Sequence, residues 1–349
     1  MREPAEIRAA LLSFFDEHAR ELPWRDTRDP YAVWVSEIML QQTRVDTVVR
    51  YYDRFLQRFP TAEALAAAEQ DEVMAAWSGL GYYRRARMLH AGVREVVARY
   101  GGRVPQDLQA RRGLPGVGRY TAGAIGSIAF GLPEPVVDGN VTRVLCRLHG
   151  IDEAPERAAA QKRLWALAEA LAEGPRPGDL NQALMELGAT VCTPSSPACE
   201  RCPLSEHCVA RAEGRVEQLP RPKKRKAPRE VRMVALLATR GRGAGRSLWL
   251  GRGGGALFGG LWNLPMAEGR GREAAATLAR DSGLRGTLSK QAIGELTHVL
   301  THRRLQVELW RMGGARARDG SELRAAPLDS LGELGVSKLT LKAAARLMP

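Results

Sequence analysis

Four of the five cysteines, Cys192, Cys199, Cys202 and Cys208, lie within one short segment of the 349-residue chain. Four thiolates can hold either one tetrahedral zinc ion or one 4Fe–4S cluster, and the donors alone do not distinguish the two. In a long chain whose amino terminus has no signal-peptide core, clustered cysteines indicate metal before disulfides. Nothing nearby suggests an open hydrolytic position, so we expect a structural or positioning role. Cys146 stands on an apolar helical stretch and is expected to be a buried core thiol.

Two acidic residues stand in contrasting predicted surroundings. Glu37 lies in the stretch 31–40, which is apolar almost all round and therefore predicted to be buried. Desolvation should raise its pKa, as a general acid requires. Asp138 precedes a predicted helix that runs to about His149, and N–H bonds and the helix dipole should hold it anionic. One protonated and one ionised carboxylate can together cleave a glycosidic bond through an oxocarbenium ion. Taken singly, Glu37 could instead pair with an arginine, and Asp138 could be an ordinary cap.

Helices must position these groups. From Arg2 to about Arg211, apolar residues recur at spacings of three and four, with no sustained alternation, which predicts a mainly α domain. Asp29 and Pro30 mark one helix start, as N-cap and first helical residue. The turn Leu114–Gly118 should join a helix ending near Arg112 to one beginning near Arg119. Such a glycine-rich turn exposes backbone N–H groups beside a helix N-terminus and so forms an anion site.

Composition indicates the class of partner. The formal net charge is +13 with 44% hydrophobic residues, which favours a globular protein that binds a polyanion. No apolar run approaches the roughly 18 residues of a membrane span, so no membrane partner is expected. We expect residues 1–213 to form the helical domain and 214–230 an exposed linker, because Leu219–Pro228 combines prolines with like charges. The linker could touch DNA, act as a nuclear address or only solubilise the chain.

The sequence pattern of residues 231–349 predicts a second, smaller α+β domain. Val231–Ala238 and Leu305–Trp310 read as strands, and Arg272–Arg280 reads as a helix. No internal repeat is visible.

Several motifs together resemble the adenine DNA glycosylases of the MutY family, in the helix–hairpin–helix (endonuclease III) superfamily. In order they are Leu22–Arg25, Trp34–Thr43, Gly79–Tyr83, Leu114–Gly118, Val137–Val141, Asn181–Gly188 and the four cysteines, whose spacing is similar to the cluster loop of endonuclease III. The resemblance covers essentially the whole chain. It implies a six-helix barrel with the hairpin (about 30–132), an iron–sulfur subdomain (1–29 plus 133–213) and one 4Fe–4S cluster. It further implies that the protein acts on duplex DNA, and we expect a monomer. The short amino-terminal extension favours a bacterial-style cytoplasmic protein, associated with the nucleoid through DNA.

The resemblance also implies a mechanism for removing adenine opposite 8-oxoguanine or G. The adenine is flipped out of the duplex, Glu37 protonates its N7, and Asp138 stabilises the sugar cation. Tyr120 and Asn140 would support Asp138 and the water. Bifunctional relatives place a nucleophilic lysine at the position of Tyr120, so this chain is expected to hydrolyse the bond without strand cleavage.

Further contacts follow from the same resemblance. The adenine pocket would contain Trp24, Arg25 and Gln182. Residues expected to contact or wedge into the DNA are Gln42, Thr43, Leu80, Tyr82, Gly116, Val117 and Gly118.

The second domain resembles a degenerate Nudix fold that recognises 8-oxoguanine. Gly259–Pro265 looks like the approach to a Nudix box, but Thr277–Leu284 lacks the glutamates that would hold a divalent metal. The family's Phe-Ser-His loop corresponds to Leu300-Thr301-His302, preceded by His298. Thr301 keeps a hydroxyl, although the aromatic residue is missing. His298 and His302 could also be plain strand-end residues.

Three other functions are compatible with parts of the sequence. An endonuclease III-like glycosylase/lyase is disfavoured by Tyr120 and by the second domain. A Nudix nucleotide hydrolase is disfavoured by the missing glutamates. A non-catalytic DNA-binding iron–sulfur protein is disfavoured because it would give Glu37 and Asp138 no function.

Overall fold

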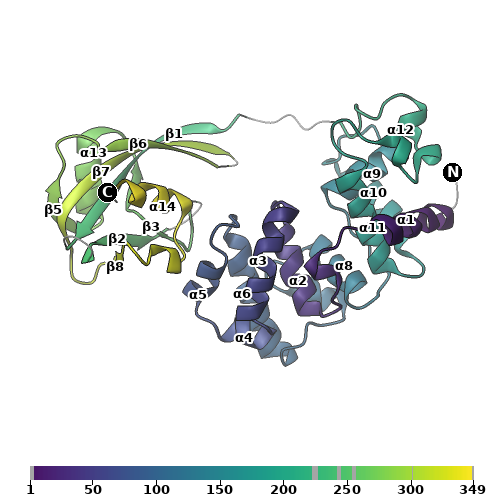
Figure 1. Cartoon of the computed structure of the whole chain (residues 1–349), viewed down its shortest axis with the longest axis horizontal. Helices are drawn as coiled ribbons and strands as arrows, with labels where there is room; N and C mark the ends of the chain where they lie inside the picture. The colour runs from purple at the N-terminus through teal and green to yellow at the C-terminus, as the bar shows by residue number, and fades with distance from the viewer. Residues whose placement is uncertain (1–3, 222–226, 242–244, 254–256, 301, 348–349) are drawn as a thin grey trace. The chain divides into compact units, whose positions relative to one another are not determined.

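The computed structural model describes residues 4–221, 227–241, 245–253, 257–300 and 302–347. The chain divides into two compact units (Figure 1). The helical unit contains residues 1–67 and 88–224, and the sheet unit contains residues 68–87 and 225–349. Segment 68–87 thus groups with the strands, although the barrel is expected to include it.

Residues 4–212 form helices and short 3-10 turns, as the sequence pattern predicts. Their bounds are α1 Pro4–His18, η1 Pro23–Arg25, α2 Pro30–Leu40, α3 Val45–Arg58, α4 Ala62–Ala67, α5 Gln70–Ala76, α6 Arg84–Tyr100, α7 Leu108–Gly113, α8 Arg119–Ile128, α9 Gly139–Leu148, α10 Ala158–Ala172, α11 Pro177–Thr190, η2 Cys199–Arg201, η3 Ser205–His207 and α12 Val209–Ala212.

Helix α2 is the buried element that the apolar pattern predicts. Every residue from Tyr31 to Met39 is buried. The Asp29 carboxylate accepts hydrogen bonds from the backbone N–H groups of Tyr31 and Ala32, at 3.3 and 3.0 Å, so the predicted N-cap is present. Helix α2 packs against α3 and α8, while α11 packs against α1, α8 and α9. These contacts bring α2, α8, α9 and α11, which carry the candidate catalytic groups, to one region.

The sheet unit is built on eight strands in the described residues. Its elements are β1 Arg229–Arg240, β2 Ser247–Arg252, β3 Trp262–Asn263, β4 Met266–Glu268, α13 Gly271–Asp281, β5 Leu284–Leu288, β6 Gly294–Val299, β7 Arg303–Ala317, β8 Arg324–Pro327, η5 Leu331–Glu333, α14 Lys338–Ala344 and η6 Ala345–Leu347. The main strand order is β3-β2-β1-β7-β5, and β4, β6 and β8 pair with β1, β7 and β2 respectively. Because β1 and β7 run parallel while the other pairs are antiparallel, the sheet is mixed.

Strand β1 is buried on both faces. Alternate residues, including Met233 and Leu237, join a core that includes α14, while Val234 and Leu236 join a second core that includes α13. Covering both faces of a central strand explains the nearly continuous apolar run at 231–238. The two predicted strands and the predicted helix lie within β1, β7 and α13, so the expected α+β organisation is confirmed.

The predicted linker is only partly exposed. Leu219 is buried, and its carbonyl oxygen accepts a hydrogen bond from Arg147 Nε at 2.9 Å. Residues 222–226 of this segment lie outside the described residues, and Arg229 and Glu230 already belong to β1. The amino-terminal part of the segment is therefore anchored to the helical unit.

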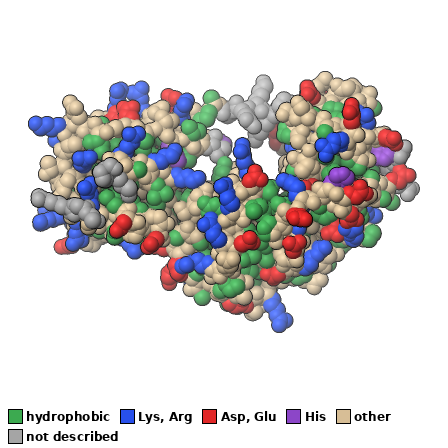
Figure 2. Space-filling view, in the orientation of Figure 1, with side chains coloured by type: hydrophobic (Ala, Val, Ile, Leu, Met, Phe, Trp, Pro, Cys, Tyr) green, Lys and Arg blue, Asp and Glu red, His purple; other side chains and the backbone are tan. Residues whose placement is uncertain are grey.

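On the face in Figure 2, lysine and arginine side chains are interspersed with acidic ones. Within the described residues, no helix has both the length and the apolar character needed to cross a membrane.

Candidate functional site

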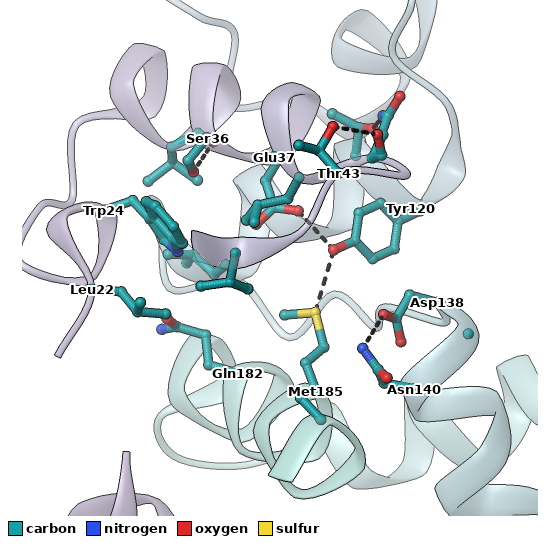
Figure 3. Close-up of a pocket in the computed structure, with 18 of the residues that line it drawn as sticks. Leu22, Trp24, Ser36, Glu37, Thr43, Tyr120, Asp138, Asn140, Gln182 and Met185 are labelled. Atoms are coloured by element: carbon teal, nitrogen blue, oxygen red, sulfur yellow. Dashed lines mark hydrogen bonds between the residues drawn. The ribbon is translucent and has the colours of Figure 1, made fainter. Parts of the chain in front are cut away.

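A cavity of about 730 Å³ opens in the helical unit and is lined by residues of α2, α8, α9 and α11 (Figure 3). The turn after α2 and the hairpin before α8 contribute its rim. Of the predicted site residues, the cavity brings together Trp24, Arg25, Glu37, Gln42, Thr43, Gly116, Gly118, Tyr120, Asp138, Asn140 and Gln182. Residues far apart in the sequence thus meet around one space large enough for a nucleobase.

Glu37 is a buried acid of the cavity, with 4% of its surface exposed. Its Oε2 accepts a hydrogen bond of 2.7 Å from the Tyr120 hydroxyl. Burial raises the pKa of Glu37 to about 7; the Tyr120 hydrogen bond opposes this rise and the negative charge of Asp138 adds to it. The direction agrees with the sequence expectation. In the described residues the partner of Glu37 is a phenol and not an arginine, so the carboxyl can exchange a proton near neutral pH.

Asp138 is the N-cap of α9, as predicted. Its Oδ1 accepts from the Val141 backbone N–H at 2.7 Å, and its Oδ2 accepts from the Asn140 side-chain amide at 3.0 Å. Burial nevertheless raises the pKa of Asp138 above its ordinary value, although the bonds from Val141 and Asn140 lower it. The effect of lost solvent on the pKa of Asp138 thus outweighs the effect of the N–H bonds.

Among the described residues the Tyr120 hydroxyl donates to Glu37, whereas the resemblance implies that it supports Asp138 and the water. Its oxygen also lies 3.3 Å from Met185 Sδ (Figure 3). Burial and the nearby charges of Glu37 and Asp138 raise the pKa of Tyr120 well above its ordinary value. The phenol therefore stays protonated and donates its one proton to the carboxylate.

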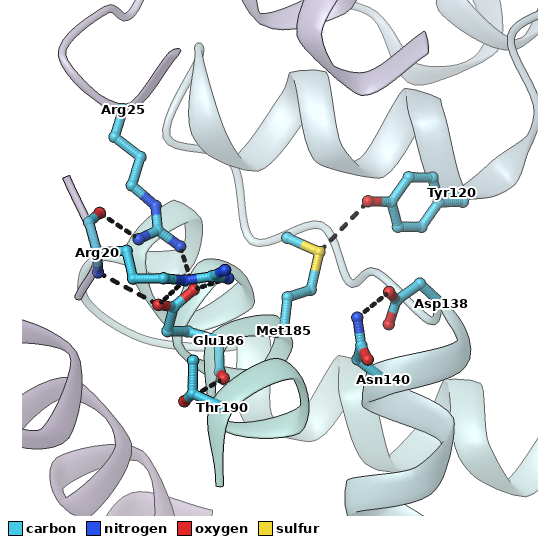
Figure 4. A network of polar contacts seen from close by, with 8 residues as sticks. All are labelled: Arg20, Arg25, Tyr120, Asp138, Asn140, Met185, Glu186 and Thr190. Carbon is cyan, nitrogen blue, oxygen red and sulfur yellow. Dashed lines mark hydrogen bonds and ion pairs between the residues drawn. The ribbon is translucent and has the colours of Figure 1, made fainter. Parts of the chain in front are cut away.

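Arg25 is held by a carboxylate that the sequence reasoning did not single out. Its Nη2 lies 2.7 Å from Glu186 Oε2, and Arg20 binds the same carboxylate at 2.7 and 2.9 Å (Figure 4). Burial raises the pKa of Glu186, but the hydrogen bonds from the two arginines lower it below its ordinary value. The sequence feature that could have predicted this ion pair is a glutamate on an apolar helix, in a chain that has two arginines near residue 22.

The other two adenine-pocket candidates are less tightly engaged. Trp24 is buried and packs edge-on against Tyr52, with ring centroids 5.6 Å apart. Gln182 lines the cavity from α11. An amide in this position offers both a donor and an acceptor to a base edge.

Arg143 was also missed by the sequence reasoning. Its Nη2 donates to Asn140 Oδ1 and to the Gly188 carbonyl, both at 2.8 Å, and its Nε donates to the Cys192 carbonyl at 2.7 Å. Arg143 therefore joins the Asp138–Asn140 pair to the start of the cysteine segment. The sequence feature that could have predicted this contact is an arginine in the helix that follows the Asp138 cap.

The hairpin has the geometry that its glycines predict. Gly116 has a φ of +79°, and a Cβ there would lie 2.7 Å from Met88 Cβ. Gly118 is the N-cap of α8, and Val117 is buried beneath the turn. The exposed Gln42 also has a positive φ, of 55°. Strain of this kind in a non-glycine residue is common at functional sites.

Two predicted DNA contacts, Leu80 and Tyr82, lie in segment 68–87 of the sheet unit. Leu80 is buried, and Tyr82 is 45% exposed with a φ of 47°. The Arg85 guanidinium lies 5.4 Å from the Trp77 ring and 5.5 Å from the Tyr82 ring. The aromatic side chain of Tyr82 is thus displayed on a strained turn that Arg85 supports.

The four predicted ligand cysteines line one small cavity beside α9. All four are half-buried and none forms a disulfide, whereas Cys146 is fully buried as predicted. Among the described residues, no group of three or more His, Cys, Asp or Glu side chains is placed to hold a single metal ion. Four thiols around a shared space fit an iron–sulfur cluster, whose irons each take one thiolate.

The predicted lesion-recognition residues are only partly described. His298 lies on β6, with its ring centroid 5.5 Å from that of Phe258. Burial and the charges of Lys342 and Lys338 lower the pKa of His298, so the ring is neutral at neutral pH. His302 is exposed, and Thr301 lies outside the described residues.

Comparison with known proteins agrees with this geometry. Residues 35–170 match the HhH-GPD superfamily of base excision DNA repair proteins, and residues 192–208 match the iron-sulfur binding domain of endonuclease III. The cysteine segment is therefore an iron–sulfur binding segment.

Two solved structures resemble the helical part. A thermostable thymine-DNA glycosylase has a TM-score of 0.56 and 34% identity, over 60% of this chain and 97% of that one. A non-covalent endonuclease III–DNA complex has a TM-score of 0.51 and 24% identity, over 61% and 99%, and indicates the fold alone.

Curated relatives extend the match. The chain is 51% identical to human adenine DNA glycosylase over 230 residues, which are 62% of this chain and 42% of the relative. It is 39% identical to the rat enzyme over 361 residues, covering 88% of this chain and 70% of the relative. The chain thus spans less than half of the human relative's length and more than two thirds of the rat relative's. On this evidence, the chain belongs to the adenine DNA glycosylase family.

Proposed function

We propose that the protein hydrolyses the N-glycosidic bond of adenine mispaired with 8-oxoguanine or G in duplex DNA. The observation that carries the proposal is a single cavity in which Glu37, with a pKa of about 7, and the capped Asp138 face the same space. The adenine is flipped out of the duplex and enters this cavity. Gln182 and Trp24 then contact its edge and face, while Arg25, held by Glu186, shapes the wall.

Glu37 acts first as a general acid. At neutral pH a carboxyl with this pKa is present in both forms, so it can protonate adenine N7 and later take a proton from water. The neutral Tyr120 hydroxyl keeps the Glu37 carboxyl oriented through their 2.7 Å hydrogen bond. Protonation makes adenine a better leaving group, because the base no longer departs as an anion.

Asp138 stabilises the sugar cation that develops as the bond breaks. Its bonds to Val141 N–H and the Asn140 amide fix its orientation before the base enters. Water completes hydrolysis and leaves an abasic site. The residue two positions after the hairpin glycine is Tyr120, which has no amine to form a Schiff base. We therefore propose a monofunctional enzyme that leaves the strand intact.

The remaining parts of the chain position the DNA. Backbone N–H groups of the hairpin Gly116–Gly118 bind a phosphate, and Gln42, Thr43, Leu80 and Tyr82 contact the duplex around the flipped base. The cysteine segment holds one 4Fe–4S cluster, which supplies a fixed, charged support for the loop and no step of hydrolysis.

Domain organisation and assembly complete the proposal. Residues 231–349 form a Nudix-like domain that recognises 8-oxoguanine through His298, Thr301 and His302, joined by the linker 214–230 to the helical domain 1–213. The protein acts as a monomer in the bacterial cytoplasm.

A labelled duplex with one A opposite 8-oxoguanine tests the activity, with A opposite G and T opposite G as parallel substrates. The products are divided and treated with or without hot alkali. Cleavage at the adenine only after alkali supports monofunctional excision. Excision of T and not A would instead favour the activity named for the thymine-DNA glycosylase relative. No excision by protein with its full iron and sulfide content would contradict the proposal.

A further inference from the structure

Arg147 is a buried cation beside the cysteine cavity. It lies in the last turn of α9, and only 2% of its surface is exposed. Its Nη1 lies 3.3 Å from Cys192 Sγ, and its own carbonyl oxygen lies 3.4 Å from Cys208 Sγ. The same residue lines the cavity that all four cysteines share. Arg147 therefore touches two of the four predicted ligands.

The rest of its guanidinium is satisfied by neutral groups. Nε donates to the Leu219 carbonyl at 2.9 Å, Nη1 to the Thr193 carbonyl at 2.8 Å, and Nη2 to the Pro194 carbonyl at 3.3 Å. Within the described parts of the chain, no carboxylate forms an ion pair with Arg147. A buried charge without a counter-charge is strongly unfavourable. The sulfur of Cys192 is the one contact that becomes anionic, when it binds iron.

The neighbouring arginine provides a contrast. Arg143 stands one turn earlier on α9, and its hydrogen bonds within the described residues go to oxygen atoms, among them the Cys192 carbonyl oxygen. The acids Glu37, Glu186, Asp138 and Glu134 of the unit have partners elsewhere. Arg211 also lines the cysteine cavity, but the hydrogen bond from a guanidinium to a cysteine sulfur in the described residues is that of Arg147 to Cys192.

We propose that Arg147 is the counter-charge of the iron–sulfur cluster, donating a charge-assisted hydrogen bond to the Cys192 thiolate. The inference rests on the proposed cluster and concerns a residue that takes no part in hydrolysis. Four thiolates give such a cluster a net negative charge, which grows by one when it is reduced. A buried guanidinium at this position stabilises the more negative state, so it raises the cluster's reduction potential and slows the loss of iron. Arg147 also ties the cysteine segment to Leu219, within the predicted linker 214–230.

Three variants of the full chain test the proposal. Arg147→Gln removes the charge, Arg147→Lys keeps it, and Arg201→Gln removes one charge from an exposed residue of the same segment as the matched control. Iron and sulfide content, the rate of iron release to a chelator and the midpoint potential by voltammetry are measured without DNA. Wild-type protein without iron and sulfide would contradict the cofactor proposal itself, separately from the role of Arg147.

We expect Arg147→Gln to release iron about tenfold faster than wild type, the change for one lost charge-assisted hydrogen bond, and to have a more negative potential. Arg147→Lys should lie between Arg147→Gln and wild type, and Arg201→Gln should match wild type. If Arg147→Gln is isolated without a cluster, retention by Arg147→Lys still supports the counter-charge. Unchanged potential and release rate in Arg147→Gln, or equal losses in the Gln and Lys variants, would overturn it.

Discussion

The Tyr120 hydroxyl donates a 2.7 Å hydrogen bond to Oε2 of Glu37, across 83 residues of sequence. This contact stabilises the carboxylate and so opposes the effect of burial on the pKa of Glu37. Tyr120, which the resemblance assigned to the support of Asp138, therefore influences the protonation of Glu37.

Tyr120→Phe removes this hydrogen bond and should raise the pKa of Glu37 above about 7. Because the protonated acid starts the reaction, the alkaline limb of the single-turnover rate should move to higher pH. The pH–rate profile on an A:8-oxoguanine duplex measures the shift. A limb that moves to lower pH, or does not move, would show that the contact does not set this ionisation.

Glu37→Gln should abolish excision and at the same time stabilise the fold at alkaline pH. The pKa of Glu37 is raised from 4.5 to about 7. Burial of its neutral form at low pH therefore costs little free energy, and the free energy of unfolding falls as pH rises between these two values. Above pH 7 the difference corresponds to about 3 kcal/mol. Thermal unfolding at pH 5 and pH 8 should show a gain for the variant mainly at pH 8. An equal gain at both values would refute the linkage.

Gly116→Ala and Gly118→Ala form a matched pair in the hairpin. The Gly116 φ of +79° and the close approach of Met88 leave no room for a methyl group, whereas a Cβ at Gly118 meets nothing within 4 Å. Gly116→Ala should lower stability by about 1–3 kcal/mol and weaken duplex binding. Gly118→Ala should stay within about 0.5 kcal/mol of wild type. Denaturant unfolding and a binding titration compare the two, and similar losses would contradict the steric argument.

Glu186→Gln leaves two arginines without their shared carboxylate. Since Glu186 is 1% exposed, we expect a loss of about 3 kcal/mol in unfolding free energy at pH 7. In the wild type, the ionised Glu186 adds to the unfolding free energy above the ordinary pKa of a glutamate. This stabilisation is lost as pH falls through the lowered pKa of Glu186 in the folded state. The gap between variant and wild type should therefore narrow on acidification. Asp16→Asn removes an exposed partner of Arg176 and is the control, with little expected change.

Local features of this protein could be predicted from its sequence because neighbouring residues determine them. Asp29 and Asp138 cap their helices through N–H groups two or three residues away. The apolar stretch 31–39 had to be buried, and Glu37 with it. The cysteine cluster and the change from a helical to a strand-like pattern after residue 228 could also be recognised from neighbouring residues alone.

Only the tertiary structure decided which distant groups meet. Glu186 joins Arg25 across 161 residues, Tyr120 reaches Glu37, and β1 runs parallel to β7. The raised pKa of Asp138 follows from burial by neighbouring helices, which no local pattern reveals. Arg147 looked like one basic residue among 52 lysines and arginines until folding buried it beside the cysteines. Caps and periodicity act over a few residues, whereas burial and ion pairing depend on which elements pack together.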